Sequence, residues 1–144
     1  MKVESILKAK GSSVTTTTPD ATIATIIRVL KDRNIGALVV SEDGSTMLGL
    51  IAERDIVHGL CYYGIRLLDL RVSDLMTRTV ITCAPDDSLT RVMAQMTRYR
   101  VRQLPVVEDG KLRGIVSIGD VVKYRLDELE LEANILRDAF LARH

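Results

Sequence analysis

The sequence predicts an α/β (α+β) fold in which two β-α-β-β-α units pack as a pseudo-twofold pair, followed by an extended C-terminal helix. The first observation behind this prediction is a repeat, because residues 19–44 align with residues 85–110 at a constant offset of 66. The second is that each copy carries one amphipathic helical pattern between short apolar or β-branched stretches. A repeat of this length indicates a duplicated structural unit, so we expect two equivalent sites between the copies.

In the first copy, Pro19 and Asp20 are expected to open the main helix. Asp20 is placed to cap the free N–H groups, and the apolar residues that follow recur with helical spacing as far as Asn34. The other elements expected in this copy are a helix over Val3–Lys8 that Lys10–Ser13 breaks, an extended segment at Val14–Thr18, strands at Gly36–Ser41 and Met47–Ala52, and a helix over Glu53–Leu60.

The second copy repeats this order, with a lead-in helix at Val72–Met76 that echoes Val3–Leu7. Each copy is therefore expected to have a lead-in helix of its own. The remaining elements expected are a strand at Val80–Thr82, a helix over Ser88–Arg98, strands at Gln103–Val107 and Leu112–Ser117, and a helix from Ile118. The predicted division is residues 1–62 for the first motif, 63–71 for a linker, 72–125 for the second motif and 126–144 for the C-terminal helix.

The tail carries apolar residues at alternating spacings of four and three, which is a heptad stripe. Its members are Val122, Leu126, Leu129, Ala133, Leu136 and Phe140. Acidic residues lie mostly on the other side of this helix. Two interpretations stay open: the helix packs on its own domain, or it forms a contact between subunits.

Composition and charge exclude several classes of protein. A hydrophobic content of 47% supports an ordinary core, and a net charge of +1 gives no global attraction to nucleic acid or to acidic membranes. Cys61 and Cys83 show no metal-ligand spacing, so no metal is expected, and two lone thiols suit a reducing cytoplasm. With neither a signal-peptide pattern nor an apolar run that spans a membrane, the expected location is cytoplasmic and away from membranes.

A motif of Gly, two apolar residues, Ser or Thr, two variable residues and Asp occurs at Gly114–Asp120. It recurs at Gly49–Asp55, with Ala52 in place of the hydroxyl residue. Together with Val72–Thr77 and Leu104–Val107, these motifs make residues 1–125 resemble a tandem pair of cystathionine-β-synthase (CBS) domains, like the small bacterial stand-alone pairs.

This resemblance implies a regulatory, energy-sensing module without catalytic activity. It implies two three-stranded sheets packed face to face and adenine nucleotides bound in the clefts between the copies. AMP is the first candidate ligand, and ATP, ADP or NAD(H) are alternatives because they share adenosine. It also implies that two chains associate into a flat disk, a homodimer, and that the module acts on a regulated protein that the sequence does not name.

The second motif makes chemical sense for a nucleotide. The Ser117 hydroxyl and the free N–H groups at the start of the following helix can accept a phosphate. Asp120, in the first helical turn, can bind both ribose hydroxyls, and the helix dipole favours a carboxylate there. The alternative is that Ser117 and Asp120 only cap the helix.

The first motif departs from this pattern because Ala52 offers no hydroxyl for a phosphate. It keeps Asp55, and Arg54 either binds a phosphate through its guanidinium fork or is a solvated charge. We expect the Asp120 site to be the better site for an AMP-like ligand.

The two copies also differ at the start of the first strand of each hairpin. By resemblance, Arg102 and Gln103 line the cleft near the phosphates, whereas small Gly36 and Ala37 in the first copy leave room for a larger ligand such as a dinucleotide. The alternative is that Arg98, Arg100 and Arg102 form a charged surface or make salt bridges between subunits. The adenine of the Asp120 site is expected to rest on Val80, Ile81 and Thr82, with Ile115 and Pro105 nearby, and Val14 and Thr15 are expected to serve the other site.

Three rival functions remain. Neither His58 nor His144 belongs to a recognisable catalytic constellation, and no Gly-rich phosphate loop is present, so an enzyme is not supported. Arg98–Arg102 interleaves charge with an aromatic, as single-strand nucleic-acid binders do, but aromatic residues total only 3%. A structural or partner-binding dimer module without ligand is the third rival.

Overall fold

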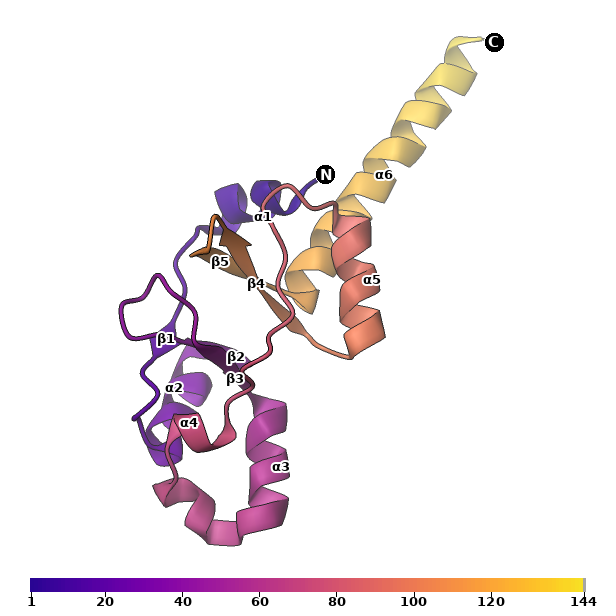
Figure 1. The fold of residues 1–144 in the computed structure, drawn as a ribbon. Coiled ribbons are helices and arrows are strands. Elements are labelled where there is room, and N and C mark those ends of the chain that lie inside the picture. The colour runs from indigo at the N-terminus through magenta and orange to yellow at the C-terminus, as the bar shows by residue number, and fades with distance from the viewer. Residues whose placement is uncertain (144) are drawn as a thin grey trace.

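The computed structural model describes residues 1–143 as two halves, each a small sheet with helices, and a long helix that leaves the second half (Figure 1). The first half contains β1 (Thr16–Thr17), α2 (Ile23–Arg33), β2 (Ala37–Val40), β3 (Gly49–Ala52), α3 (Glu53–Tyr63), η1 (Gly64–Asp69) and α4 (Val72–Leu75). The second half contains α1 (Val3–Lys10), α5 (Leu89–Tyr99), β4 (Gln103–Glu108), β5 (Lys111–Ser117) and α6 (Ile118–Ala142). The predicted fold class, a pair of such motifs with an extended C-terminal helix, is confirmed.

Hydroxyl residues begin the two equivalent helices. The Thr22 hydroxyl accepts from the Thr25 N–H at 3.3 Å, and the Ser88 hydroxyl accepts from the Arg91 N–H at 3.1 Å. The prediction that Asp20 caps the first of these helices is wrong. The helix begins at Ile23, so Thr22 is the residue whose side chain reaches the free N–H groups.

The first sheet has the order β1-β2-β3, with β1 parallel and β3 antiparallel to β2. The second sheet has only β4 and β5, so the prediction of a strand at Val80–Thr82 and of two three-stranded sheets is wrong. There the entering segment pairs through Cys83 alone, whose N–H donates to the Pro105 carbonyl at 3.0 Å.

Pro105 explains why this pairing stops. It stands where the first copy has Val39, which pairs with Thr16. A proline has no N–H to donate to the neighbouring strand, so the next ladder bond toward Ile81 cannot form.

The lead-in helices are exchanged between the halves. Val3 and Ile6 of α1 are fully buried in the core of the second half, and Val72 of α4 is fully buried in the core of the first half. Matching backbone bonds hold them: the Val3 N–H donates to Asp87 O at 2.9 Å, and the Val72 N–H donates to Ala21 O at 2.8 Å. The prediction that each lead-in helix packs in its own copy is therefore wrong.

This exchange creates two crossing segments, residues 11–15 and 76–82, which pass from one half to the other (Figure 1). The facing sides of the two sheets pack through a small apolar cluster. Its buried members Ala37, Val39 and Leu50 contact Val14, Val80, Leu112 and Ile115, among others. The region predicted as a linker contains η1, whose Leu67 is buried in the core of the first half.

Helix α6 continues without a break to Ala142; residue 144, which the predicted tail segment also included, lies outside the described residues. Val121 is fully buried, but Leu126 is 60% exposed and Leu136 is 71% exposed. The alternative in which the whole stripe packs on its own domain is therefore wrong for this chain. Among residues 1–143, no helix combines the length and the apolar character that crossing a membrane requires.

Candidate functional site

The two motif carboxylates occupy equivalent places in the first turns of α3 and α6. Asp120 accepts the Ser117 N–H at 2.9 Å and Asp55 accepts the Ala52 N–H at 2.8 Å, so both carboxylates are fixed by the strand end that precedes them. The Asp120 N–H in turn donates to the Ser117 hydroxyl at 3.2 Å, which completes a reciprocal cap. Ala52 has no hydroxyl with which to do the same.

Different groups complete the two carboxylate environments. Lys10, the last residue of α1, donates from Nζ to Asp120 Oδ2 at 2.7 Å and to the Ile115 carbonyl at 3.0 Å. The Thr77 hydroxyl donates to Asp55 Oδ1 at 3.2 Å. One carboxylate is thus paired with a cation, and the other with a neutral hydroxyl.

The pKa of Asp120 reflects this pairing. Partial burial pushes the pKa of this carboxyl upward, but the hydrogen bond from Lys10, the Ser117 N–H and the Lys10 charge together outweigh it. The net result is a pKa below the ordinary value, so Asp120 is ionised at neutral pH and can accept hydrogen bonds from a ligand.

A cavity of about 330 Å³ opens at Asp120, between the two halves. Its lining combines residues of the crossing segment 11–15 with both sheets; it consists of Lys10, Ser13, Thr15, Asn34, Ile35, Gly36, Ala37, Gln103, Ile115, Ser117 and Asp120. The equivalent cavity at Asp55 has about 100 Å³ and is lined by Leu50, Arg54, Asp55, Thr77, Thr79, Val80, Ile81, Val101 and Gln103.

These linings reverse one prediction. Val80 and Ile81 were expected to serve the Asp120 site, and Thr15 the Asp55 site, but each lies in the opposite cavity. The exchange of lead-in helices is the physical reason. Because α1 belongs to the second half, the segment after it passes Asp120 before it enters the first sheet. The segment after α4 passes Asp55 in the same way.

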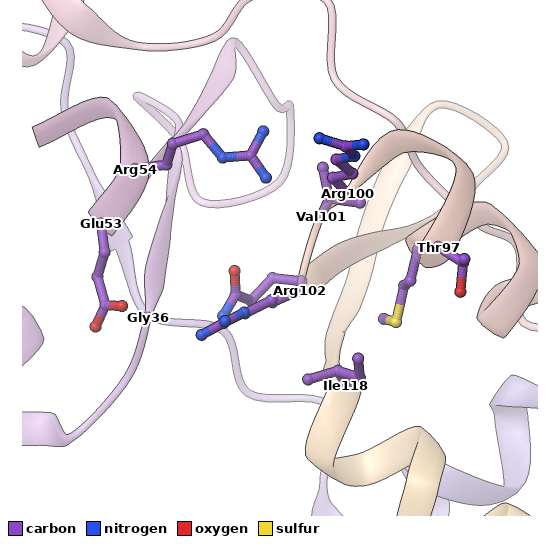
Figure 2. A pocket seen from close by; sticks show the side chains of 10 residues that line it. Gly36, Glu53, Arg54, Thr97, Arg100, Val101, Arg102 and Ile118 are labelled. Carbon is purple, nitrogen blue, oxygen red and sulfur yellow. The ribbon is translucent and has the colours of Figure 1, made fainter. Parts of the chain in front are cut away.

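A third cavity, of about 520 Å³, shares Gly36 and Gln103 with the Asp120 cavity and Arg54, Val101 and Gln103 with the Asp55 cavity, and we call it the central cavity. Arg54 from α3 reaches across it toward Arg100, while Arg102 extends along its floor toward Gly36 and Glu53 (Figure 2). Arg98 lies instead over the Tyr99 ring, at 5.4 Å from its centroid. Three guanidinium groups and one carboxylate therefore surround a space that suits an anionic ligand.

Arg100 holds a backbone conformation that its residue type disfavours. Its φ is +54°, in the left-handed region, as is that of its counterpart Asn34 at +52°. Asparagine tolerates this conformation better than arginine does, and local strain of this kind is frequent at binding sites. Arg100 is the C-cap residue of α5, and it lines the central cavity.

Gln103 borders all three cavities. A Cβ on Gly36 would come within 2.5 Å of Gln103 Nε2, so the absence of a side chain at Gly36 is what admits the glutamine amide. From the sequence, Gly36 and Ala37 are expected to leave room for a ligand. The structure fills part of that room with Gln103, whose flexible end can move.

The other predicted site residues lie around these cavities. Val14 packs in the cluster between the sheets, Pro105 is buried where it pairs with Ile115, and Thr82 lies half-buried in the crossing segment. The site residues that the sequence did not predict include the polar residues Lys10, Ser13, Glu53, Thr77 and Thr79. Lys10 lies 110 residues from Asp120 along the chain, so no local pattern indicates their contact.

No metal centre accompanies the carboxylates in the part of the chain described, residues 1–143, because no three His, Cys, Asp or Glu residues gather closely enough to hold an ion. Asp55 and Asp120 instead have protein donors on their oxygens.

Comparison with known proteins decides the family. The model of the CBS domain matches twice, at residues 7–62 and 72–127. The chain belongs to the CBS-domain family. The resemblance read from the two motifs is thereby confirmed, and the chain is a CBS pair.

Its relatives include several CBS-domain proteins. The chain is 34% identical over 129 residues to the mitochondrial protein CBSX3 of Arabidopsis thaliana, which covers 84% of this chain and 63% of that protein. It is 30% identical over 119 residues to YhcV of Bacillus subtilis, which covers 83% of this chain and 84% of that protein. The chain thus spans less than two thirds of the length of CBSX3.

Solved structures agree with this assignment. The CBS-domain protein ATU1752 of Agrobacterium tumefaciens is 39% identical with a TM-score of 0.83, over 87% of this chain and 99% of that one. The CBS pair of protein MJ0100, in complex with 5′-methylthioadenosine and S-adenosyl-L-methionine, is 25% identical with a TM-score of 0.71, over 86% of this chain and 98% of that one.

Proposed function

We propose that this CBS pair is a non-catalytic regulatory module that binds an adenine nucleotide in the cavity at Asp120. The observation that carries the proposal is the ionised carboxylate of Asp120. It is fixed at the N-terminus of α6 and lines a cavity between the two halves of a CBS pair. That the related MJ0100 pair holds two adenosine compounds supports an adenosine ligand here.

Each part of such a ligand has a chemical counterpart. Asp120 would accept hydrogen bonds from both ribose hydroxyls. The Ser117 hydroxyl and the first N–H groups of α6 would receive a phosphate, since a helix N-terminus favours anions. Ile115 and the crossing segment at Thr15 would hold the adenine, through apolar contact and through backbone groups.

Lys10 gives this site a cation that can change partners. Its Nζ pairs with Asp120 Oδ2 at 2.7 Å. Ribose hydroxyls that bind Asp120 would displace Lys10, and the flexible lysine would then pair with the ligand phosphate. AMP supplies both groups, which makes it the first candidate.

The central cavity would take whatever extends beyond the first phosphate. Arg54, Arg100 and Arg102 would pair with the further phosphates of ADP or ATP, or with the pyrophosphate of NAD(H). The Asp55 cavity, with its smaller volume and no hydroxyl at Ala52, would bind more weakly or take only part of a larger ligand.

Regulation follows from where the ligand lies. The cavity wall contains residues of both halves, so a bound nucleotide would favour one relative arrangement of the halves over another. Its effect on a partner protein equals the difference in its affinity for those arrangements. Homodimer formation, a cytoplasmic location and a regulated partner complete this proposal.

Calorimetric titration of AMP, ADP, ATP, NAD⁺ and NADH into the wild type, Asp120→Ala and Asp55→Ala tests it. Asp120→Ala removes charged hydrogen bonds worth about 1.5–3 kcal/mol, so we expect it to weaken binding by about 10- to 150-fold. Asp55→Ala serves as the matched variant and should weaken it less. Wild-type affinity of Asp120→Ala for every ligand would overturn the assignment of the site, and failure of the wild type to bind any of the five would favour a purely structural module.

A further inference from the structure

The heptad stripe of α6 is exposed along its length. Helix α6 leaves the body of the molecule as an extended rod (Figure 1), and exposure reaches 44% at Leu129 and 71% at Leu136. In heptad notation, Leu126, Ala133 and Phe140 occupy a positions, and Val122, Leu129 and Leu136 occupy d positions.

The body of the protein covers a different side of this helix. Val121 is fully buried and Tyr124 packs against the core of the second half. At 3.6 residues per turn, these two residues lie roughly 100° and 160° around the helix from Val122. The stripe therefore faces away from the body and is open to another helix.

Charged residues on both edges of the stripe indicate how that helix runs. The g positions hold Arg125, Glu132 and Ala139, and the e positions hold Lys123, Glu130 and Arg137. In a parallel pair, each g residue meets the e residue of the next heptad on the partner. Arg125 would meet Glu130 of the partner subunit, and Glu132 would meet Arg137 of the partner subunit, so both contacts join opposite charges.

An antiparallel pair would join like charges. Such a pair places g beside g and e beside e. Glu132 would then face Glu132 of the partner subunit, and Glu130 would face Glu130 of the partner subunit. Arg125 already contacts Glu128 and lies 3.9 Å from Glu132 on its own helix, which holds the guanidinium at the edge of the stripe.

We propose that α6 pairs with α6 of a second copy of this chain as a parallel two-stranded coiled coil. Leucine at the d positions suits two strands, and Ala133 allows the two backbones to approach closely. Both bodies then lie at the same end of the coil. Because Ser117 and Asp120 lie at the start of this same helix, the Asp120 site of each subunit is joined to the coil by continuous α-helix.

A disulfide trap tests the orientation. Leu136→Cys in a Cys61→Ser background places one thiol at a d position. In the parallel pair the two thiols face each other, and mild oxidation should join most chains through a disulfide. In an antiparallel pair, each thiol would face Leu126 of the partner subunit, about 15 Å away from its equivalent, which is too far for a disulfide.

Leu131→Cys in the same background is the matched control, because Leu131 is 61% exposed but lies on the opposite side of α6. We expect efficient crosslinking at position 136 and little at position 131. Equal crosslinking at both positions, or none at position 136, would overturn the proposal.

A charge exchange gives an independent readout in the native background. Glu132→Arg would turn two attractive contacts of the dimer into repulsive ones and raise its Kd by about 4- to 30-fold in sedimentation equilibrium. The double variant Glu132→Arg/Arg137→Glu should restore the wild-type Kd. An unchanged Kd in Glu132→Arg, or a monomeric wild type, contradicts the parallel coil. These measurements need no nucleotide, so their failure leaves the proposed ligand untouched.

Discussion

The Asp120 and Asp55 sites share a backbone frame and differ in what surrounds it. Each carboxylate accepts the N–H three residues before it at 2.8–2.9 Å. Around Asp120 stand Ser117, Lys10 and a cavity of about 330 Å³. Around Asp55 stand Ala52, Thr77 and a cavity of about 100 Å³.

This difference separates two contributions to a binding site. The duplicated strand-to-helix turn positions the carboxylate, and it does so equally in both copies. The side-chain donor of each carboxylate comes from elsewhere: Lys10, at the end of α1, donates to Asp120, and Thr77, in the second crossing segment, donates to Asp55. Charge and volume are therefore set by residues outside the repeated motif, and the two sites can diverge while the frame stays intact.

The largest expected change in ligand affinity comes from a side chain that fills the cavity at Asp120 and leaves the cavity at Asp55 open. Gly36 borders the Asp120 cavity and the central cavity. A Gly36→Leu side chain would collide with Gln103 and occupy both spaces, so we expect AMP affinity to fall by at least about tenfold, the effect of about 1.4 kcal/mol. Calorimetry measures this, and an unchanged melting temperature is the control. Wild-type affinity would show that the ligand lies elsewhere.

Removal of the lysine should make the two sites more alike. In Lys10→Met we expect AMP to bind about three- to tenfold more weakly, because a charged contact to the phosphate is lost. Adenosine, which has no phosphate, should keep its affinity. Lys8→Met is the matched control, because Lys8 lies 3.8 Å from Glu4 on the exposed side of α1. Equal losses for AMP and adenosine would mean that Lys10 does not meet the phosphate.

A gain of function at the weaker site sharpens the comparison further. Ala52→Ser supplies the hydroxyl that Ser117 supplies in the second copy. One added neutral hydrogen bond should raise the affinity of the Asp55 site by about two- to fivefold. The change is best measured in an Asp120→Ala background, where the first-copy site is observed alone. No gain there would indicate that cavity volume, and not the missing hydroxyl, limits this site.

The smallest expected effect concerns stability and pH. Because the folded-state pKa of Asp120 lies below its ordinary value of 3.8, the stability that Lys10 confers is present above that value. It is lost as the pH falls through the folded-state pKa. At neutral pH the free energy of unfolding of the wild type should exceed that of Lys10→Met by up to about 1 kcal/mol, and the two values should converge once the pH lies below the folded-state pKa of Asp120. Urea unfolding at several pH values checks this, and a difference that persists at low pH would indicate lost packing.

Much of the fold was predictable from local patterns. The repeat predicts two equivalent units, and helical spacing together with short apolar or β-branched stretches predicts the order of helices and strands to within a few residues. The missing strand at Val80–Thr82 was less accessible, because its cause is Pro105, a residue on the neighbouring strand. Thr22 replaced Asp20 as a cap because the helix begins two residues later than Asp20 could reach.

The sequence by itself determined the duplication, the two motif carboxylates, the hydroxyl difference between Ser117 and Ala52, and the heptad stripe. All of these depend on residues close together in the chain, where spacing dictates geometry. Only the tertiary structure decided which crossing segment meets which carboxylate. That choice follows from burial of Val3 and Ile6 in the second half and of Val72 in the first. The hydrophobic effect is non-directional, so the spacing of apolar residues does not say which core a helix joins. A contact such as that of Lys10 with Asp120 therefore forms only when the two cores are packed.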